Sequence, residues 1–157
     1  MSGVGRSKAE VMFIFDVPLA EDDRVGRHLV GEPGAQLDRI LKSMLGLERA
    51  DVYITTVVKC RPREGGEVSE ELVTACSPWV EQELRAIRPH VIVAGGPMIA
   101  NYLSPDARGF ESRIGVWTQW EETRVMPLYH PEALLRNRAL RRAVFNAMVK
   151  IQHYLKS

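Results

Sequence analysis

The sequence has few cysteines, little net charge and no long apolar run. Its only cysteines are Cys60 and Cys76 among 157 residues, and two thiols in an intracellular chain are typical of free thiols or ligands. The net charge of +1 means that any nucleic-acid surface must be a local cluster of basic residues. The N-terminus "MSGVGRSKAEV" lacks the apolar core of a signal peptide. We therefore expect a cytoplasmic protein with no membrane partner.

The composition is that of an ordinary globular domain. Apolar residues make up 45% and charged residues 26% of the chain, and a chain of this length is long enough to bury a core. We expect one domain over residues 1–157.

Four apolar segments have the pattern of buried strands, and helical patterns separate them. We expect the strands over residues 11–17, 52–58, 90–96 and 124–131. We expect the helices over residues 35–45, 69–87, 98–103 and 132–155. Residues 114–120 alternate like a hairpin strand, and residues 19–34 are predicted to form a polar loop outside the core. This order predicts an α/β fold of three layers, with helices on both faces of a central, mainly parallel four-stranded sheet.

Chemically distinct residues follow the predicted strands. In parallel sheets, function gathers at the carboxyl ends of the strands, where this chain has Asp16, the basic pair around Cys60, Gly95-Gly96 and His130. Asp16 can serve as a functional carboxylate or as a simple cap, and a lone histidine is more often structural than catalytic. No phosphate-loop pattern surrounds the glycines, so they predict a turn.

The segment "EALLRNRALRRAV" near the C-terminus admits two interpretations. It carries four arginines within seven residues, Arg136 to Arg142, directly after Leu134 and Leu135. Such a run is usually a solvated helix face. Alternatively, an apolar tip backed by guanidinium groups suits insertion into a base stack with binding of phosphates.

Four sequence blocks, in their order, resemble the uracil-DNA glycosylase superfamily. The blocks are "EDDRVGRHLVGEPGAQLDRIL", "VYITTVVKCRPR", "ACSPWVEQELRAIRPHVIVAGG" and "GVWTQW…VMPLYHPEALLRN". The resemblance spans about Val11 to Leu140 and is strongest to the iron–sulfur branch, family 4. It implies a DNA-repair glycosylase that hydrolyses the N-glycosidic bond of a flipped uracil or other deaminated base. The implied partners are DNA and replication or repair proteins.

The resemblance also implies a set of site residues. Asp16 and His130 take the catalytic positions. The base pocket falls on Val17, Pro18, Leu29 and Thr56. DNA contact falls on Lys59, Arg61, Pro131, Leu134, Leu135 and Arg136.

Several positions depart from the family pattern. The family's glycine-glutamate-alanine-proline-glycine motif reads "FDVPL" here, so Phe15 and Leu19 replace the two glycines. Leu29 stands where the family has a phenylalanine that stacks on uracil, and Thr56 where it has an asparagine that reads the uracil edge. A hydroxyl cannot donate and accept across two atoms as an amide does, and leucine offers no ring for stacking. These changes predict a weakened or altered specificity for uracil.

Cys60 and Cys76 fall on two of the four positions that bind a [4Fe–4S] cluster in the family. The other two cysteines of the family lie upstream of the first strand, where this chain has none. Because such clusters are bound by four thiolates, the two cysteines are interpreted as remnant ligands. No cofactor is expected unless two further cysteines come from outside this chain.

Two functions of different classes follow. Survival of Asp16, His130 and the leucine–arginine segment favours a glycosylase. The combined changes in the pocket and at the cluster positions favour a catalytically degenerate DNA-binding or accessory module of a replication or repair assembly. An unrelated small-molecule α/β enzyme would require a phosphate or cofactor motif, which the sequence lacks.

Overall fold

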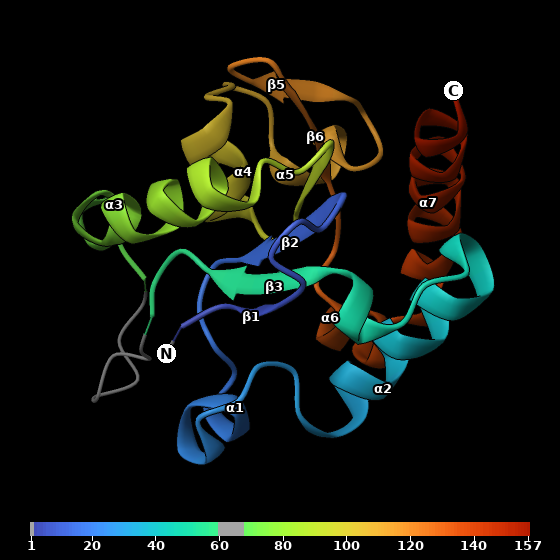
Figure 1. The fold of residues 1–157 in the computed structure, drawn as a ribbon, viewed down its shortest axis with the longest axis horizontal. Helices are drawn as coiled ribbons and strands as arrows, with labels where there is room; N and C mark the ends of the chain where they lie inside the picture. The colour runs from blue at the N-terminus through green and yellow to red at the C-terminus, as the bar shows by residue number, and fades with distance from the viewer. Residues whose placement is uncertain (1, 60–67) are drawn as a thin grey trace.

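The computed structural model describes residues 2–59 and 68–157 (Figure 1), so Cys60 and Arg61 lie outside the described residues. A six-stranded sheet has the order β1-β3-β2-β4-β6-β5. The four middle strands, mutually parallel, are β2 (Val11–Phe15), β3 (Tyr53–Thr56), β4 (Val91–Ala94) and β6 (Thr123–Pro127). The predicted α/β class with a central parallel sheet is confirmed.

The predicted number of four strands is wrong, because a short antiparallel strand lies at each edge. β1 (Val4–Gly5) pairs with β3, and β5 (Thr118–Trp120) pairs with β6. β5 is the hairpin strand that the alternating pattern indicates. β1 has only two residues, both exposed, so the sequence has no hydrophobic pattern there that would predict a strand.

Helices cover both faces of the sheet (Figure 1). One face packs on α3 (Glu70–Ile87) and α4 (Pro97–Leu103) through Met12 and Ile14 of β2. The other face packs through Phe13 and Phe15 on α2 (Gly31–Ile40), its π-helical continuation η1 (Leu41–Leu45), α6 (Pro131–Arg136) and α7 (Arg141–Lys156). Successive side chains of a strand point to opposite faces, and this alternation produces the two cores. No helix in the described ranges is long and apolar enough to cross a membrane.

Four short helical elements complete the described elements. Two of these are the α-helices α1 (Ala20–Val25) and α5 (Phe110–Arg113). The remaining short elements are two 3₁₀ turns, η2 (Arg49–Asp51) and η3 (Arg138–Leu140).

The segment of residues 19–34 is not the polar surface loop that the sequence predicts. It contains α1 and the start of α2, and it buries Asp22, His28 and Leu29. The polar groups are buried because each finds a partner. The Asp22 carboxylate accepts the Val30 N–H at 2.9 Å, and His28 Nε2 lies 2.9 Å from the carbonyl oxygen of Ser2.

The predicted helix over residues 132–155 is interrupted at Asn137. This residue has an extended backbone, with φ −142° and ψ 99°, and its side chain accepts the N–H of Ala139 at 3.0 Å. Asn137 thereby ends α6 and begins the turn η3, which leads into α7. The interruption lets α6 and α7 pack separately against the sheet.

Candidate active site at the carboxyl edge of the sheet

Asp16 follows β2 directly, and its carboxylate binds the first turn of α4. Its two oxygens accept the N–H of Ile99 at 2.8 Å and the N–H of Met98 at 3.2 Å. The carboxylate thus caps α4 as an N-cap side chain would, although it comes from a different element. Burial raises the pKa of Asp16 above its ordinary value, and the two backbone hydrogen bonds oppose that shift.

Gly95 and Gly96 leave room for the residues that follow β2. A Cβ atom at position 95 would lie 2.3 Å from two carbons of the Phe15 ring, and one at position 96 would lie 2.6 Å from the Asp16 carboxylate. Both distances are far below van der Waals contact. The glycine pair is therefore required by packing at this edge, in keeping with the predicted turn.

Phe15 contacts His130 on the face of the sheet opposite α4. The ring of Phe15 is 2% exposed, and its centroid lies 4.6 Å from that of the His130 ring at an interplanar angle of 56°. Within the described residues no hydrogen bond joins Asp16 to His130. The structure therefore places the Phe15 ring, rather than the carboxylate, against the imidazole.

His130 is held as a neutral imidazole with one defined tautomer. Its Nδ1 accepts the N–H of Glu132 at 3.0 Å, which leaves the proton on Nε2. Burial lowers the pKa of His130 to about 4, so the ring is uncharged at neutral pH. A partly buried neutral imidazole with a free N–H can donate a hydrogen bond to a developing anion.

Thr56 lies beside Phe15 and carries an unsatisfied hydroxyl. The two residues are register partners in β3 and β2, so their side chains leave the same face of the sheet. Thr56 is 2% exposed, and among the side chains that the structure describes its Oγ1 is the buried polar atom without a hydrogen-bond partner. A buried hydroxyl of this kind is unfavourable unless a ligand or water completes its bonding.

Leu29 belongs to the same core and has a strained backbone. Its φ is +50°, which is uncommon for a leucine. Arg49 holds the turn by donating to the carbonyls of His28 and Leu29, both at 3.1 Å. A Cβ at Gly34 would lie 1.8 Å from the Leu29 carbonyl oxygen. Arg49 and Gly34 were not identified from the sequence, because their partners lie in another element.

The other two predicted pocket residues differ in placement. Val17 is partly buried and packs on the core beneath α3 and α4, the face opposite Phe15. Pro18 is buried. Leu29 and Phe15 therefore belong to one hydrophobic cluster, and His130 packs against the Phe15 ring. Val17 lies in the cluster on the other face of the sheet.

Lys59 is engaged inside the protein. Its ammonium pairs with Glu83 of α3 and donates to the Thr55 hydroxyl at 2.6 Å. Glu83 also accepts from the Tyr53 hydroxyl at 2.6 Å and from the Gly3 N–H at 3.1 Å. This network ties β3 to α3 and engages the Lys59 ammonium within the protein. The contact of Lys59 with DNA that the sequence predicts stays a prediction. The other basic neighbour of Cys60, Arg61, lies outside the described residues.

Leu134 and Leu135 do not form a joint surface tip. Leu134 is 1% exposed and belongs to the core, whereas Leu135 is 38% exposed. Pro131 is buried as the first residue of α6, and Arg136 is exposed and paired with Glu132 one turn earlier. Helical periodicity separates adjacent residues by about 100°, so only Leu135 remains at the surface.

A sequence model of the uracil DNA glycosylase superfamily matches residues 2–153. The chain belongs to the uracil DNA glycosylase superfamily. The type-4 uracil-DNA glycosylase of Saccharolobus solfataricus is 36% identical over 163 residues, which cover 99% of this chain and 76% of the relative. Those of Sulfurisphaera tokodaii and Thermotoga maritima are 39% and 33% identical, covering 96% and 98% of this chain and 72% and 82% of the relatives. The resemblance stated from the sequence motifs is confirmed.

The residues of this glycosylase-family chain do not fit a [4Fe–4S] cluster. The chain has two cysteines, and such a cluster is bound by four thiolates. Cys76 is half-buried and packs against the core beneath α3, and Cys60 lies outside the described residues. Among the described residues no group of three or more histidine, cysteine or acidic side chains could hold a metal ion.

Replacing Asp16 tests its role as the cap of α4. We expect Asp16→Ala to lower the free energy of unfolding by about 1–2 kcal/mol, because two N–H groups lose their acceptor. Asp16→Asn keeps one acceptor oxygen and should lose less. Urea denaturation measures both, with Asp23→Ala on the exposed side of α1 as the control. Equal stability of Asp16→Ala and the wild type would contradict the capping role.

His130 gives the stability a defined pH dependence. Its native pKa of about 4 lies below the ordinary value of 6.5, so between these values the unfolded chain binds a proton that the native state does not. The contribution of His130 is therefore fully present above pH 6.5 and is lost as the pH falls toward 4. We expect the wild type to lose more stability than His130→Gln between pH 7 and pH 4.5 in urea titrations. Parallel losses in the two proteins would show that the imidazole is not held neutral.

Proposed function

We propose that this protein is a DNA glycosylase, which hydrolyses the N-glycosidic bond of a flipped uracil or other deaminated base with weakened specificity for uracil. The observation that carries the proposal is the partly buried, neutral His130 with its tautomer fixed by the Glu132 N–H. Membership in the superfamily and the names of the type-4 relatives support the same reaction class.

His130 would stabilise the departing base. As the bond between the sugar carbon and the base nitrogen breaks, its electron pair stays on the base, which leaves as an anion. The Nε2–H of the neutral His130 donates a hydrogen bond to that anion and keeps its proton, because the base departs unprotonated. Removing one such donor typically lowers the rate by about 10²–10³-fold.

Asp16 would act on the sugar side of the reaction. A water molecule adds to the cationic sugar carbon and loses one proton to solvent or to the carboxylate. Each Asp16 oxygen accepts one hydrogen bond from an α4 N–H, and its second lone pair can accept a hydrogen bond from a water molecule. The two hydrogen bonds fix the carboxylate, so its negative charge is available in one position.

Phe15 and Thr56 would set the base specificity. The Phe15 ring contacts the catalytic imidazole, so a base that reaches His130 must displace the ring or lie to one side of it. The Thr56 hydroxyl offers a single donor and acceptor atom. Both features favour recognition of one carbonyl on the base rather than the paired edge of uracil.

DNA would be held from the α6 side. Leu135 is the exposed apolar residue there, and exposed arginines follow it at positions 136, 138 and 142. A single leucine can fill the gap left by a flipped nucleotide while guanidinium groups bind phosphates. This assignment replaces the two-leucine wedge of the sequence prediction with Leu135 alone.

A second candidate function is a DNA-binding or accessory module without turnover. Two observations favour it: the Phe15 ring lies against His130, and the Asp16 carboxylate is bound to α4. A glycosylase requires the ring to move when a base enters. An accessory module requires no such motion.

A strand-cleavage assay separates the two functions. Oligonucleotides that carry uracil or hypoxanthine, single-stranded or mismatched, are incubated with protein and then heated in alkali. We expect abasic sites from the wild type and a rate about 10²–10³-fold lower for His130→Ala. His90→Ala, an exposed histidine before β4 at the opposite edge, should match the wild type. Absence of product, with binding retained in a gel shift, would favour the accessory module.

Phe15→Gly tests the specificity assignment. Removing the ring opens the space beside His130 and Gly95, so we expect kcat/KM for uracil excision to rise about tenfold or more. Adding Thr56→Asn should raise the preference for uracil over hypoxanthine, because an amide offers a donor and an acceptor together.

The control for Phe15→Gly is Phe13→Ala. The centroid of the Phe13 ring lies 6.3 Å from that of the Phe15 ring in the same core. Both variants lose a buried ring and about 3–5 kcal/mol of stability, but only the first opens the site. The rates of the two variants are compared at a temperature below the Tm of the less stable variant. Unchanged uracil excision in Phe15→Gly, with the protein folded, would show that the ring does not limit base entry.

A further inference from the structure

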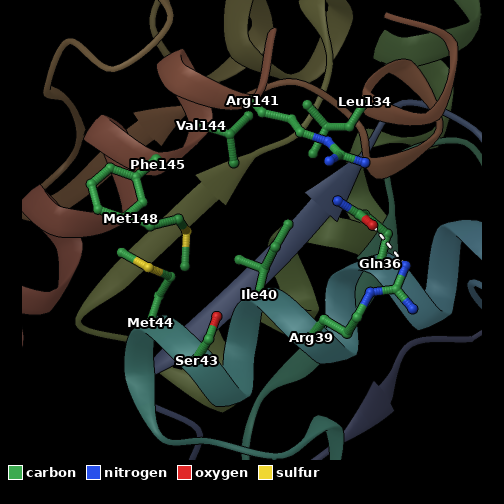
Figure 2. A pocket seen from close by; sticks show the side chains of 10 residues that line it. All are labelled: Gln36, Arg39, Ile40, Ser43, Met44, Leu134, Arg141, Val144, Phe145 and Met148. Carbon is green, nitrogen blue, oxygen red and sulfur yellow. Dashed lines mark hydrogen bonds between the residues drawn. The ribbon is translucent and has the colours of Figure 1, made fainter. Parts of the chain in front are cut away.

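A cavity of about 340 Å³ lies between α2 with its continuation η1 and the first half of α7. Its volume falls in the range of small-ligand sites. Figure 2 shows that its two ends differ: the polar side chains Gln36, Arg39 and Arg141 gather at one end, and Met44, Phe145 and Met148 at the other. None of the site residues discussed above except Leu134 lines it.

The polar end is prepared for an anion. Arg141 forms no hydrogen bond or ion pair within the part of the chain that the structure describes. Arg39 donates to the Gln36 side chain at 2.8 Å and is 4.0 Å from the exposed Glu32. The lining holds two guanidinium groups and no carboxylate. Arg141 is the first residue of α7, directly after the turn η3, and its side chain is exposed at the mouth of the cavity.

The apolar end presents a ring and two flexible thioethers. Phe145 is 56% exposed, although large apolar side chains are mostly buried in this protein. Exposed aromatic rings are platforms on which nucleobases stack, and methionine side chains adapt to the shape of a ligand. The π-helical turn Leu41–Leu45 brings Ser43 and Met44 to the lining. Such turns occur frequently at functional sites.

The cavity is continuous with the surface proposed to hold DNA. α6 begins directly after His130, and Leu134 of α6 lines the cavity from the inside. The chain then passes through η3, with Arg138 exposed, to Arg141 at the mouth. Exposed arginines thus follow one another along the chain from η3 to the mouth of the cavity, and several cations close together suit a polyanion better than a single acidic group.

We infer that this cavity is a nucleotide-binding subsite, which takes one unpaired nucleotide of the DNA strand next to the target. The base stacks on Phe145 and packs against Met44 and Met148, and its phosphate binds Arg141 and Arg39. The inference rests on the proposed function, since its ligand is the DNA on which the protein acts.

The test compares two lengths of single-stranded DNA on the full chain. Fluorescence anisotropy measures the affinity for uracil oligonucleotides with two or with ten nucleotides on each side of the target. We expect Arg141→Ala and Phe145→Ala to weaken binding of the long oligonucleotide by about tenfold and to leave the short one unchanged. Arg141→Ala should also reduce the salt dependence by about one phosphate contact. The matched controls are Arg88→Ala and Trp79→Ala, both exposed and on α3 or its end.

A position scan with 2-aminopurine locates the nucleotide. We expect quenching at one flanking position in the wild type and its loss in Phe145→Ala. Equal affinities of the wild type and the variants for both lengths would overturn the subsite. Quenching that Phe145→Ala leaves unchanged would also overturn it, and the cavity would then have to bind a ligand of another class.

Base excision from the short oligonucleotide reports on the proposed function separately. Excision that depends on His130, together with no effect of the cavity variants, would refute the subsite alone. A length-dependent loss of affinity in those variants without excision by the wild type would support the subsite and refute the glycosylase.

Discussion

The hydrogen bonds from Asp16 to the first turn of α4 are the interaction on which the candidate site depends. They join the end of a central strand to the helix that follows its neighbour, β4, and Gly96 leaves space for the carboxylate. Because Asp16 is bound on the α4 side, Phe15 before it points to the opposite face. The position of the Phe15 ring against His130 is thus a consequence of the same strand end.

Substitutions at this edge are coupled through packing. A bulky residue at position 15 is tolerated only because position 95 is a glycine, since a Cβ there would lie 2.3 Å from the ring. The ring in turn lies beside the unsatisfied hydroxyl of Thr56. The departures from the family motif at positions 15 and 56 therefore belong to one remodelled region, in which an aromatic ring and a hydroxyl meet at the imidazole side of the sheet.

Sequence reasoning identified the parallel core strands, because each is a short apolar run followed by a turn signal. It identified the family from ordered blocks, and the superfamily match confirms it. It could not reveal that Lys59 pairs with Glu83, since 24 residues separate them, or that Asp22 and His28 are buried with local partners. Leu134 and Leu135 are adjacent in sequence, and only the position of α6 on the core decides which one is exposed.

The net charge of +1 is compatible with binding to DNA, because the basic residues differ in what they contact. Several cations are neutralised by carboxylates of the same chain, as Lys59 is by Glu83, Arg85 by Glu121 and Arg108 by Asp106. The exposed arginines at positions 138, 141 and 142 have no such partner among the described residues. Three unpaired arginines thus lie within five residues of the chain, from η3 to the start of α7, and a polyanion responds to that local field rather than to the sum over the chain. The same segment carries the exposed Leu135 and leads to Phe145, so charge and apolar surface coincide where a strand of DNA needs both.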